Sequence, residues 1–140
     1  MVSPVQIQLV QTSWQRLLPI QNEVARLFYD RLFELDPGVR ALFPAADMRE
    51  QGRKLTAMIT TAVNGLSRLE SIVPAVRALG RRHSGYGVTD AHYDTVAAGL
   101  IWTLEQGLGD SFTQPVREAW IEVYGLLSSV MKKAASVEIA

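Results

Sequence analysis

The chain has 140 residues, 48% of them hydrophobic, and its 14 basic residues balance its 14 acidic ones. This size and composition predict one globular domain over residues 1–140, and the zero net charge gives no electrostatic reason to expect nucleic acid or an acidic membrane as a partner. The absence of cysteine excludes disulfides, zinc–thiolate sites, iron–sulfur clusters and thiol catalysis.

Cap-and-proline signals mark the first helices. Ser3 followed by Pro4 predicts a helix start, and apolar residues keep helical spacing until Pro19 interrupts them. Asp36–Pro37 repeats the signal and predicts a short turn of helix that ends near Phe43. The helix between these two segments is expected to bury Val24, Ala25, Phe28, Leu32 and Leu35.

Asp47 with Glu50 three residues later predicts a capping box at the start of the next helix. The amphipathic stripe of that helix is expected to contain Leu55, Met58, Ile59, Ala62, Val63 and Leu66.

Three more helices are predicted in the second half of the chain. Ser71 and Pro74 are expected to open the first, Thr89 to cap the second, and Thr113 with Pro115 to start the last. No segment alternates with period two, so the predicted class is all-α with about seven helices.

His83 ends an apolar stripe formed by Ile72, Val76 and Leu79, which places it on the inner face of its helix just before a glycine-rich turn. An inward histidine is more often a hydrogen-bonded core residue, and the alternative is a metal ligand. Arg77, Arg81 and Arg82 form a basic strip beside it, which is either a solvated face or a clamp for an anionic ligand.

Tyr29, Gln51 and His83 are polar side chains on or beside apolar faces of different helices. Burying them without partners would cost ~1–3 kcal/mol each, so we expect them to share an interior task. One well-placed histidine without cysteine cannot hold a bare metal. A prosthetic group that brings its own donors and needs one protein ligand fits better, and haem is such a group.

Over nearly its whole length the sequence resembles the globins, above all the bacterial single-domain, neuroglobin-like globins and then the globin domains of flavohaemoglobins. Pro37 followed by Phe43 is similar to the globin helix-C proline and the phenylalanine that stacks on the porphyrin. The LGRRH segment Leu79–His83 with Tyr86–Val88 resembles the proximal segment, and Ala119–Gly125 resembles the last helix.

The resemblance implies a globin fold, a three-over-three helical sandwich around haem b (iron protoporphyrin IX), with His83 as the proximal iron ligand. Tyr29 and Gln51 match the two distal positions that face bound gas. Gln51 stands where vertebrate globins and neuroglobin have a distal histidine, so ligation by two histidines is not expected. The other residues expected to contact the haem are Phe43, Leu55, Leu79, Arg82, Val88, Tyr93 and Val96.

The resemblance also implies reversible binding of O2, CO and NO, with O2 binding, storage or transport as the function. Bound O2 is a good hydrogen-bond acceptor, so a phenol and an amide should make its binding tight and its release slow. The alternatives are an NO dioxygenase that depends on an external reductase, because no flavin or nicotinamide domain is expected here, and a gas or redox sensor. We expect a cytoplasmic protein, a monomer or weak homodimer.

In flavohaemoglobins a tyrosine and a last-helix glutamate support the proximal histidine. Tyr93 matches the tyrosine. The glutamate position falls near Ala135, and Glu138 is out of register. We therefore expect weaker electron donation by His83 than in those enzymes.

Overall fold

The computed structural model describes residues 2–43, 47–85 and 88–139, with the side chains of all of these except 84, 85 and 135–139. Every regular element in these ranges is helical, which confirms the predicted class. The α-helices are α1 (Pro4–Leu17), α2 (Gln21–Leu35), α3 (Met48–Asn64), α4 (Leu69–Gly85), α5 (Asp90–Leu108) and α6 (Gln114–Ile139). The 3-10 helices are η1 (Leu18–Ile20), η2 (Pro37–Leu42), η3 (Gly65–Arg68) and η4 (Gly109–Ser111).

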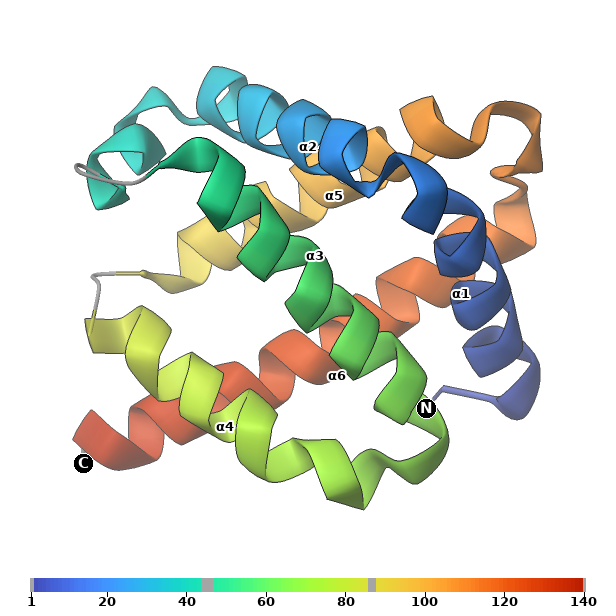
Figure 1. Cartoon of the computed structure of the whole chain (residues 1–140). Helices are drawn as coiled ribbons and strands as arrows, with labels where there is room; N and C mark the ends of the chain where they lie inside the picture. The colour runs from blue at the N-terminus through green and yellow to red at the C-terminus, as the bar shows by residue number, and fades with distance from the viewer. Residues whose placement is uncertain (1, 44–46, 86–87, 140) are drawn as a thin grey trace.

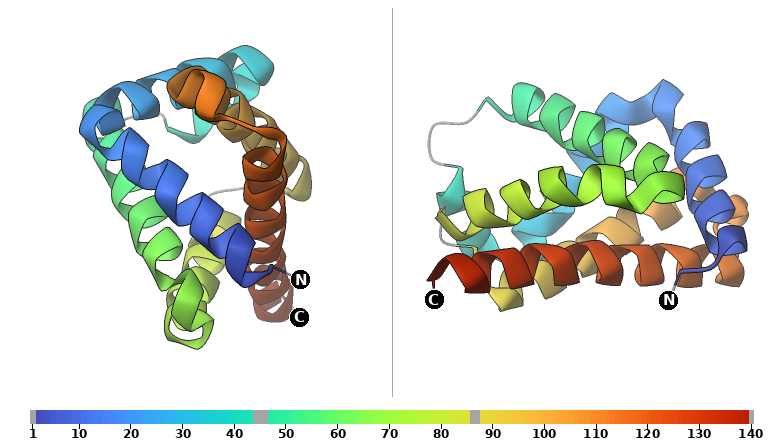
Figure 2. Two further views of the ribbon diagram at one scale, coloured as in Figure 1. Left: turned by 90° about the vertical axis from the view of Figure 1, so that its right-hand side faces the viewer. Right: turned by 90° about the horizontal axis from the view of Figure 1, so that it is seen from below.

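The helices form two layers that cross each other. α3 and α4 lie in front of α6, and α2 packs on α5 (Figure 1). α6 runs along much of the molecule with α4 beside it (Figure 2), and α1 packs against the first half of α6. This is the predicted layered helical fold, and it brings the C-terminal half of α4 next to α6.

The predicted helix starts are largely confirmed. The Ser3 hydroxyl accepts a hydrogen bond from the Gln6 N–H at 3.1 Å, and the Gln6 side chain accepts one from the Ser3 N–H. Thr89 forms a similar box with His92, whose Nδ1 accepts from the Thr89 N–H at 3.0 Å. The Thr113 hydroxyl accepts from the Val116 N–H at 3.4 Å and opens α6.

Three local predictions are wrong. α4 begins at Leu69, directly after η3, so that Pro74 lies inside the helix rather than at its start. Leu35 is 41% exposed, because α2 ends there and the chain turns into η2. Asp47 caps α3 by accepting from the Arg49 N–H. Glu50 pairs with Arg53 instead of completing a capping box.

Two tryptophans tie the layers together. The Trp14 indole donates to the Thr60 hydroxyl at 2.9 Å, and the Trp120 indole donates to Ser13 Oγ at 2.8 Å. The two rings meet edge to face with their centroids 6.1 Å apart. These contacts connect α1 to both α3 and α6, so the scaffold beside the candidate site is held by buried and satisfied polar groups.

Within the described part of the chain, no helix combines the length and the apolar character that crossing a bilayer requires.

Candidate functional site

His83 lies in the last turn of α4, and the packing of that helix determines where the imidazole sits. Ile72 and Val76 are buried on its inner face. They pack against Met131 of α6. We use the name proximal cluster for Ile72, Val76, Tyr93 and Met131 together with the half-buried Leu79 and Val88 that pack against them.

α4 approaches α6 unusually closely at Gly80, one turn before His83. A Cβ atom at Gly80 would lie 2.4 Å from the carbonyl oxygen of Met131 and 2.6 Å from its Cα. These are backbone atoms, which cannot rotate away, so only glycine allows this approach. The backbone of α6 therefore fixes the position of the last turn of α4, which carries His83.

The His83 imidazole is half-buried and neutral at pH 7. Burial lowers the pKa of His83, and the positive charge of Arg82 lowers it further. None of the hydrogen bonds among the described residues engages the imidazole, whereas the backbone carbonyl of His83 accepts from the Val88 N–H at 3.0 Å. A neutral imidazole has a free lone pair, which is the form that binds metals.

Tyr93 of α5 is the aromatic neighbour of His83. The two ring centroids are 6.5 Å apart at an interplanar angle of 57°. The Tyr124 hydroxyl donates to the Tyr93 carbonyl at 2.6 Å, and Lys132 Nζ lies 5.3 Å from the Tyr93 ring centroid. Burial and the charge of Asp90 raise the pKa of the Tyr93 phenol, so it stays protonated at neutral pH.

Tyr29 of α2 and Gln51 of α3 come together where these two helices pack, and Tyr29 belongs to a different apolar cluster from the proximal one. Tyr29 is only 7% exposed, and burial raises the pKa of its phenol, an effect that the neighbouring Gln51 amide partly opposes. Gln51 is half-buried in the first turn of α3. The helices approach closely here, since a Cβ at Gly52 would lie 2.9 Å from the Ala25 methyl.

Aromatic side chains lie next to the Tyr29 ring. The Tyr29 ring centroid lies 5.7 Å from that of Phe43 and 6.0 Å from that of Phe33. Arg40 holds Phe43 from the outside by donating to its carbonyl oxygen at 3.2 Å, and its guanidinium lies 5.4 Å from the Phe33 ring centroid. Phe43, on which a flat ring could stack, is half-buried.

Leu55 and Val96 belong with Tyr29 and Phe43. Both are half-buried and pack on the large hydrophobic cluster that contains Tyr29, which we call the distal cluster. Of the described residues, only Leu127 packs on both this cluster and the proximal one. The sequence-predicted residues thus fall into two groups, which we call walls: Tyr29 and Gln51 lie with the distal cluster, and His83 lies with the proximal cluster.

Arg82 is exposed at the end of α4 and belongs to neither wall. Its role as an anion clamp stays a prediction. Tyr86 and Gly87 lie outside the described residues, as do the side chains of Ala135 and Glu138, so the predictions made for them are not examined by the structure.

These walls fit a haem better than a bare metal ion. Among the described side chains, no three histidine, cysteine, aspartate or glutamate residues gather to hold a metal. One neutral imidazole on one wall and a phenol with an amide on the other suit a cofactor that supplies its remaining donors. Half-buried apolar side chains on both walls suit a flat apolar ring between them.

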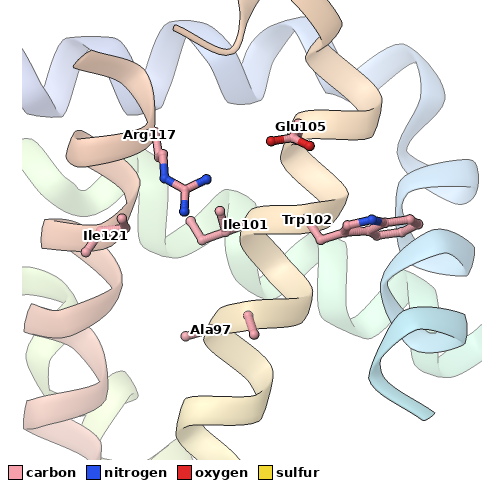
Figure 3. A pocket seen from close by; sticks show the side chains of 7 residues that line it. Ala97, Ile101, Trp102, Glu105, Arg117 and Ile121 are labelled. Atoms are coloured by element: carbon pink, nitrogen blue, oxygen red, sulfur yellow. The ribbon is translucent and has the colours of Figure 1, made fainter. Parts of the chain in front are cut away.

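A separate pocket of about 410 Å³ lies between the outer faces of α5 and α6 (Figure 3). Its two charged side chains, Glu105 and Arg117, come from different helices and flank an apolar floor. It contains none of the predicted site residues. The lining residues are Ala97, Ala98, Ile101, Trp102, Glu105, Arg117 and Ile121.

Sequence reasoning missed Gly80 and Lys132. Gly80 matters through a backbone contact that joins segments about fifty residues apart in the chain, which no local pattern reveals. Lys132 matters through its position over the ring of Tyr93, which depends on how α5 and α6 pack and which no local pattern reveals.

Comparison with known proteins finds relatives over most of the chain. The family model for globins matches residues 26–131. The chain is 28% identical to neuroglobins of Chaenocephalus aceratus and Dissostichus mawsoni, in matches that span 90% of this chain and 87% of each relative. It is 30% identical to a flavohemoprotein of Xylella fastidiosa over 96% of this chain, which spans only 34% of that longer protein.

Proposed function

The chain belongs to the globin family, whose members bind diatomic gases through haem, and we propose that it binds haem b and takes up O2 reversibly. The observation that carries the proposal is the pairing of the buried Tyr29 phenol with Gln51, on a different wall from the one that carries His83. A haem bound between the walls would supply the iron to which O2, CO and NO attach.

His83 would hold the iron, and its surroundings suit that task. The lowered pKa keeps the imidazole neutral, and the contact between α4 and α6 at Gly80 holds its helix in place. Phe43, Leu55, Leu79, Val88, Tyr93 and Val96 would contact the porphyrin, and Arg82 would face its edge.

Tyr29 and Gln51 would determine which gas is held tightly. The raised pKa keeps the Tyr29 phenol protonated, so it remains a hydrogen-bond donor at neutral pH. The Gln51 amide offers a second donor. Bound O2 carries partial negative charge and accepts such bonds well, whereas bound CO is less polar and gains less.

The first test is an absorption spectrum of the purified full-length chain in the ferric, ferrous, O2 and CO states. Haem uptake with a ferrous form that binds O2 and CO directly supports the proposal. A chain that takes up no haem contradicts it, and so does a ferrous form that binds neither O2 nor CO.

Replacement of Tyr29 by phenylalanine is expected to accelerate O2 dissociation by about 10- to 100-fold. The change removes one donor with little change of shape, and a hydrogen bond to a charged acceptor contributes about 1.5–3 kcal/mol. Gln51→Leu should act in the same direction. The double variant should be non-additive, because both donors bind one acceptor. Stopped-flow displacement of O2 by CO measures these rates.

CO dissociation from the same variants is the control. It should change much less than O2 dissociation, since CO is the weaker acceptor. Equal acceleration of both gases would mean that Tyr29 and Gln51 control access to the pocket rather than stabilising O2.

A second candidate function is NO dioxygenation with electrons from an external reductase, favoured by the match to a flavohemoprotein across 96% of this chain. We expect the O2-loaded protein to convert one equivalent of NO to nitrate rapidly. Turnover should then stop when only NADH is supplied, and resume when a reductase is added. Continued nitrate production with this chain and NADH alone would contradict the need for an external reductase.

A further inference from the structure

We propose that Lys132 tunes the reduction potential of the haem by placing a positive charge beside the proximal wall. The proposal rests on the proposed function, since it presumes that His83 holds a haem. Lys132 is not among the residues that the sequence indicated, and it would act through the electric field of its charge rather than by touching the iron.

The position of the ammonium group is set by α6. Lys132 is half-buried, and its Nζ lies 5.3 Å from the ring centroid of Tyr93. The electron-rich face of an aromatic ring attracts a cation at this distance, more strongly where water is partly excluded. The neighbouring Met131 backbone abuts Gly80, so this part of α6 has little freedom to shift.

Tyr93 connects this charge to the candidate ligand. Its ring lies 6.5 Å from that of His83, and the Tyr124 hydroxyl fixes its backbone by a 2.6 Å hydrogen bond to its carbonyl. Tyr93 is 8% exposed, so the ring that neighbours both the lysine and the imidazole is largely shielded from bulk water. Screening of the charge there is weaker than at an open surface.

The sign of the effect follows from Coulomb's law. Ferric haem carries one more positive charge than ferrous haem, so a nearby cation disfavours the ferric state. Arg82, beside His83, adds to this field from α4, while Asp90 at the start of α5 opposes it. Among the described side chains, Lys132 is the cation that lies over the ring of Tyr93, and it should favour the ferrous form that binds O2.

The test measures the midpoint potential of the haem in the full chain by spectroelectrochemistry. Lys132→Met keeps a long apolar side chain and removes the charge, and it should raise the ferric-to-ferrous ratio at fixed potential by about threefold. Lys132→Glu should shift the ratio further in the same direction. Lys132→Arg keeps the charge and changes the shape of the side chain, so its midpoint potential should stay close to that of the wild type. If packing rather than charge set the potential, Lys132→Arg should shift it as well.

Lys133 supplies the matched control. It carries the same charge one position later, and its side chain is exposed. Lys133→Met should leave the potential nearly unchanged, because water and salt screen its charge. Thermal unfolding of each haem-free variant shows whether the fold is kept.

Each result decides the matter. The proposal is supported if the midpoint potential is highest in the wild type and Lys132→Arg, lower in Lys132→Met and lowest in Lys132→Glu. Lys133→Met must also keep the midpoint potential of the wild type. An unchanged potential in Lys132→Met with a normal haem spectrum overturns this inference alone, as does an equal shift in Lys133→Met. A wild-type chain that takes up no haem overturns the proposed function, and this inference falls with it.

Discussion

Replacement of His83 by alanine is expected to abolish stable haem retention. The imidazole is the only histidine ring on the proximal wall, and burial keeps it in the neutral form that binds iron. Loss of a partner that merely supports a metal ligand costs about 10- to 100-fold in affinity, so loss of the ligand itself should cost more. Transfer of haem to an apo-globin scavenger, followed by absorption, measures the rate.

His92 is the matched control, because the chain contains only these two histidines. Both of its nitrogens have neighbours of their own. Nδ1 accepts from the Thr89 N–H at 3.0 Å, and Nε2 lies 4.0 Å from the Asp36 carboxylate. His92→Ala should therefore remove one half of the Thr89–His92 capping box, lower the free energy of unfolding by no more than the cost of a lost N-cap residue, about 0.5–2 kcal/mol, and leave haem retention unchanged.

Imidazole added to His83→Gly offers a sharper check, since it can occupy the space that the side chain leaves. Recovery of a proximal-imidazole spectrum would show that the ligand is missing rather than the fold. A His83→Ala protein that keeps its normal spectrum, while His92→Ala loses it, would reverse the assignment of the two histidines.

Local signals predicted the helices well because each signal acts within one turn. Ser3, Thr89 and Thr113 cap helices by hydrogen bonds to residues three positions away, so the sequence contains the whole interaction. The prediction from Pro74 was wrong because this signal, too, covers only one turn and does not indicate what precedes it. A proline favours the first turn of a helix, but here η3 leads directly into α4 and the proline is accommodated inside it.

Two kinds of evidence in the sequence predicted residues of the site: helical spacing and the family resemblance. Spacing placed Tyr29, Gln51 and His83 on or beside apolar faces, and the resemblance gave them roles. The resemblance also implied the globin arrangement of these faces, and it matched Tyr93 to the tyrosine that supports the proximal histidine. The structure places the rings of His83 and Tyr93 6.5 Å apart. That Lys132 lies over the ring of Tyr93 was not predicted, because it depends on how α5 and α6 pack in three dimensions.

Gly80 illustrates this limit most clearly. Within α4 a glycine is a poor helix former, and alanine would be favoured by about 1 kcal/mol on propensity alone. The close approach of α6 reverses that preference. The Cβ of an alanine would lie 2.4 Å from the carbonyl oxygen of Met131, 2.6 Å from its Cα and 2.8 Å from its carbonyl carbon. Relief requires the two helices to separate.

Replacement of Gly80 by alanine is therefore expected to destabilise the haem-free protein by about 1–3 kcal/mol and to accelerate haem loss, because α4 carries His83 one turn later. Gly125→Ala is the control. Gly125 also lies within a helix, but nothing lies within 4 Å of a Cβ placed there, so that variant should be neutral or more stable by up to about 1 kcal/mol. Urea unfolding of the apoproteins and haem transfer from the holoproteins measure the two effects. Suppose that Gly80→Ala is as stable as Gly125→Ala and keeps its haem equally well. The close contact between α4 and α6 at Gly80 would then not be what holds His83 in position.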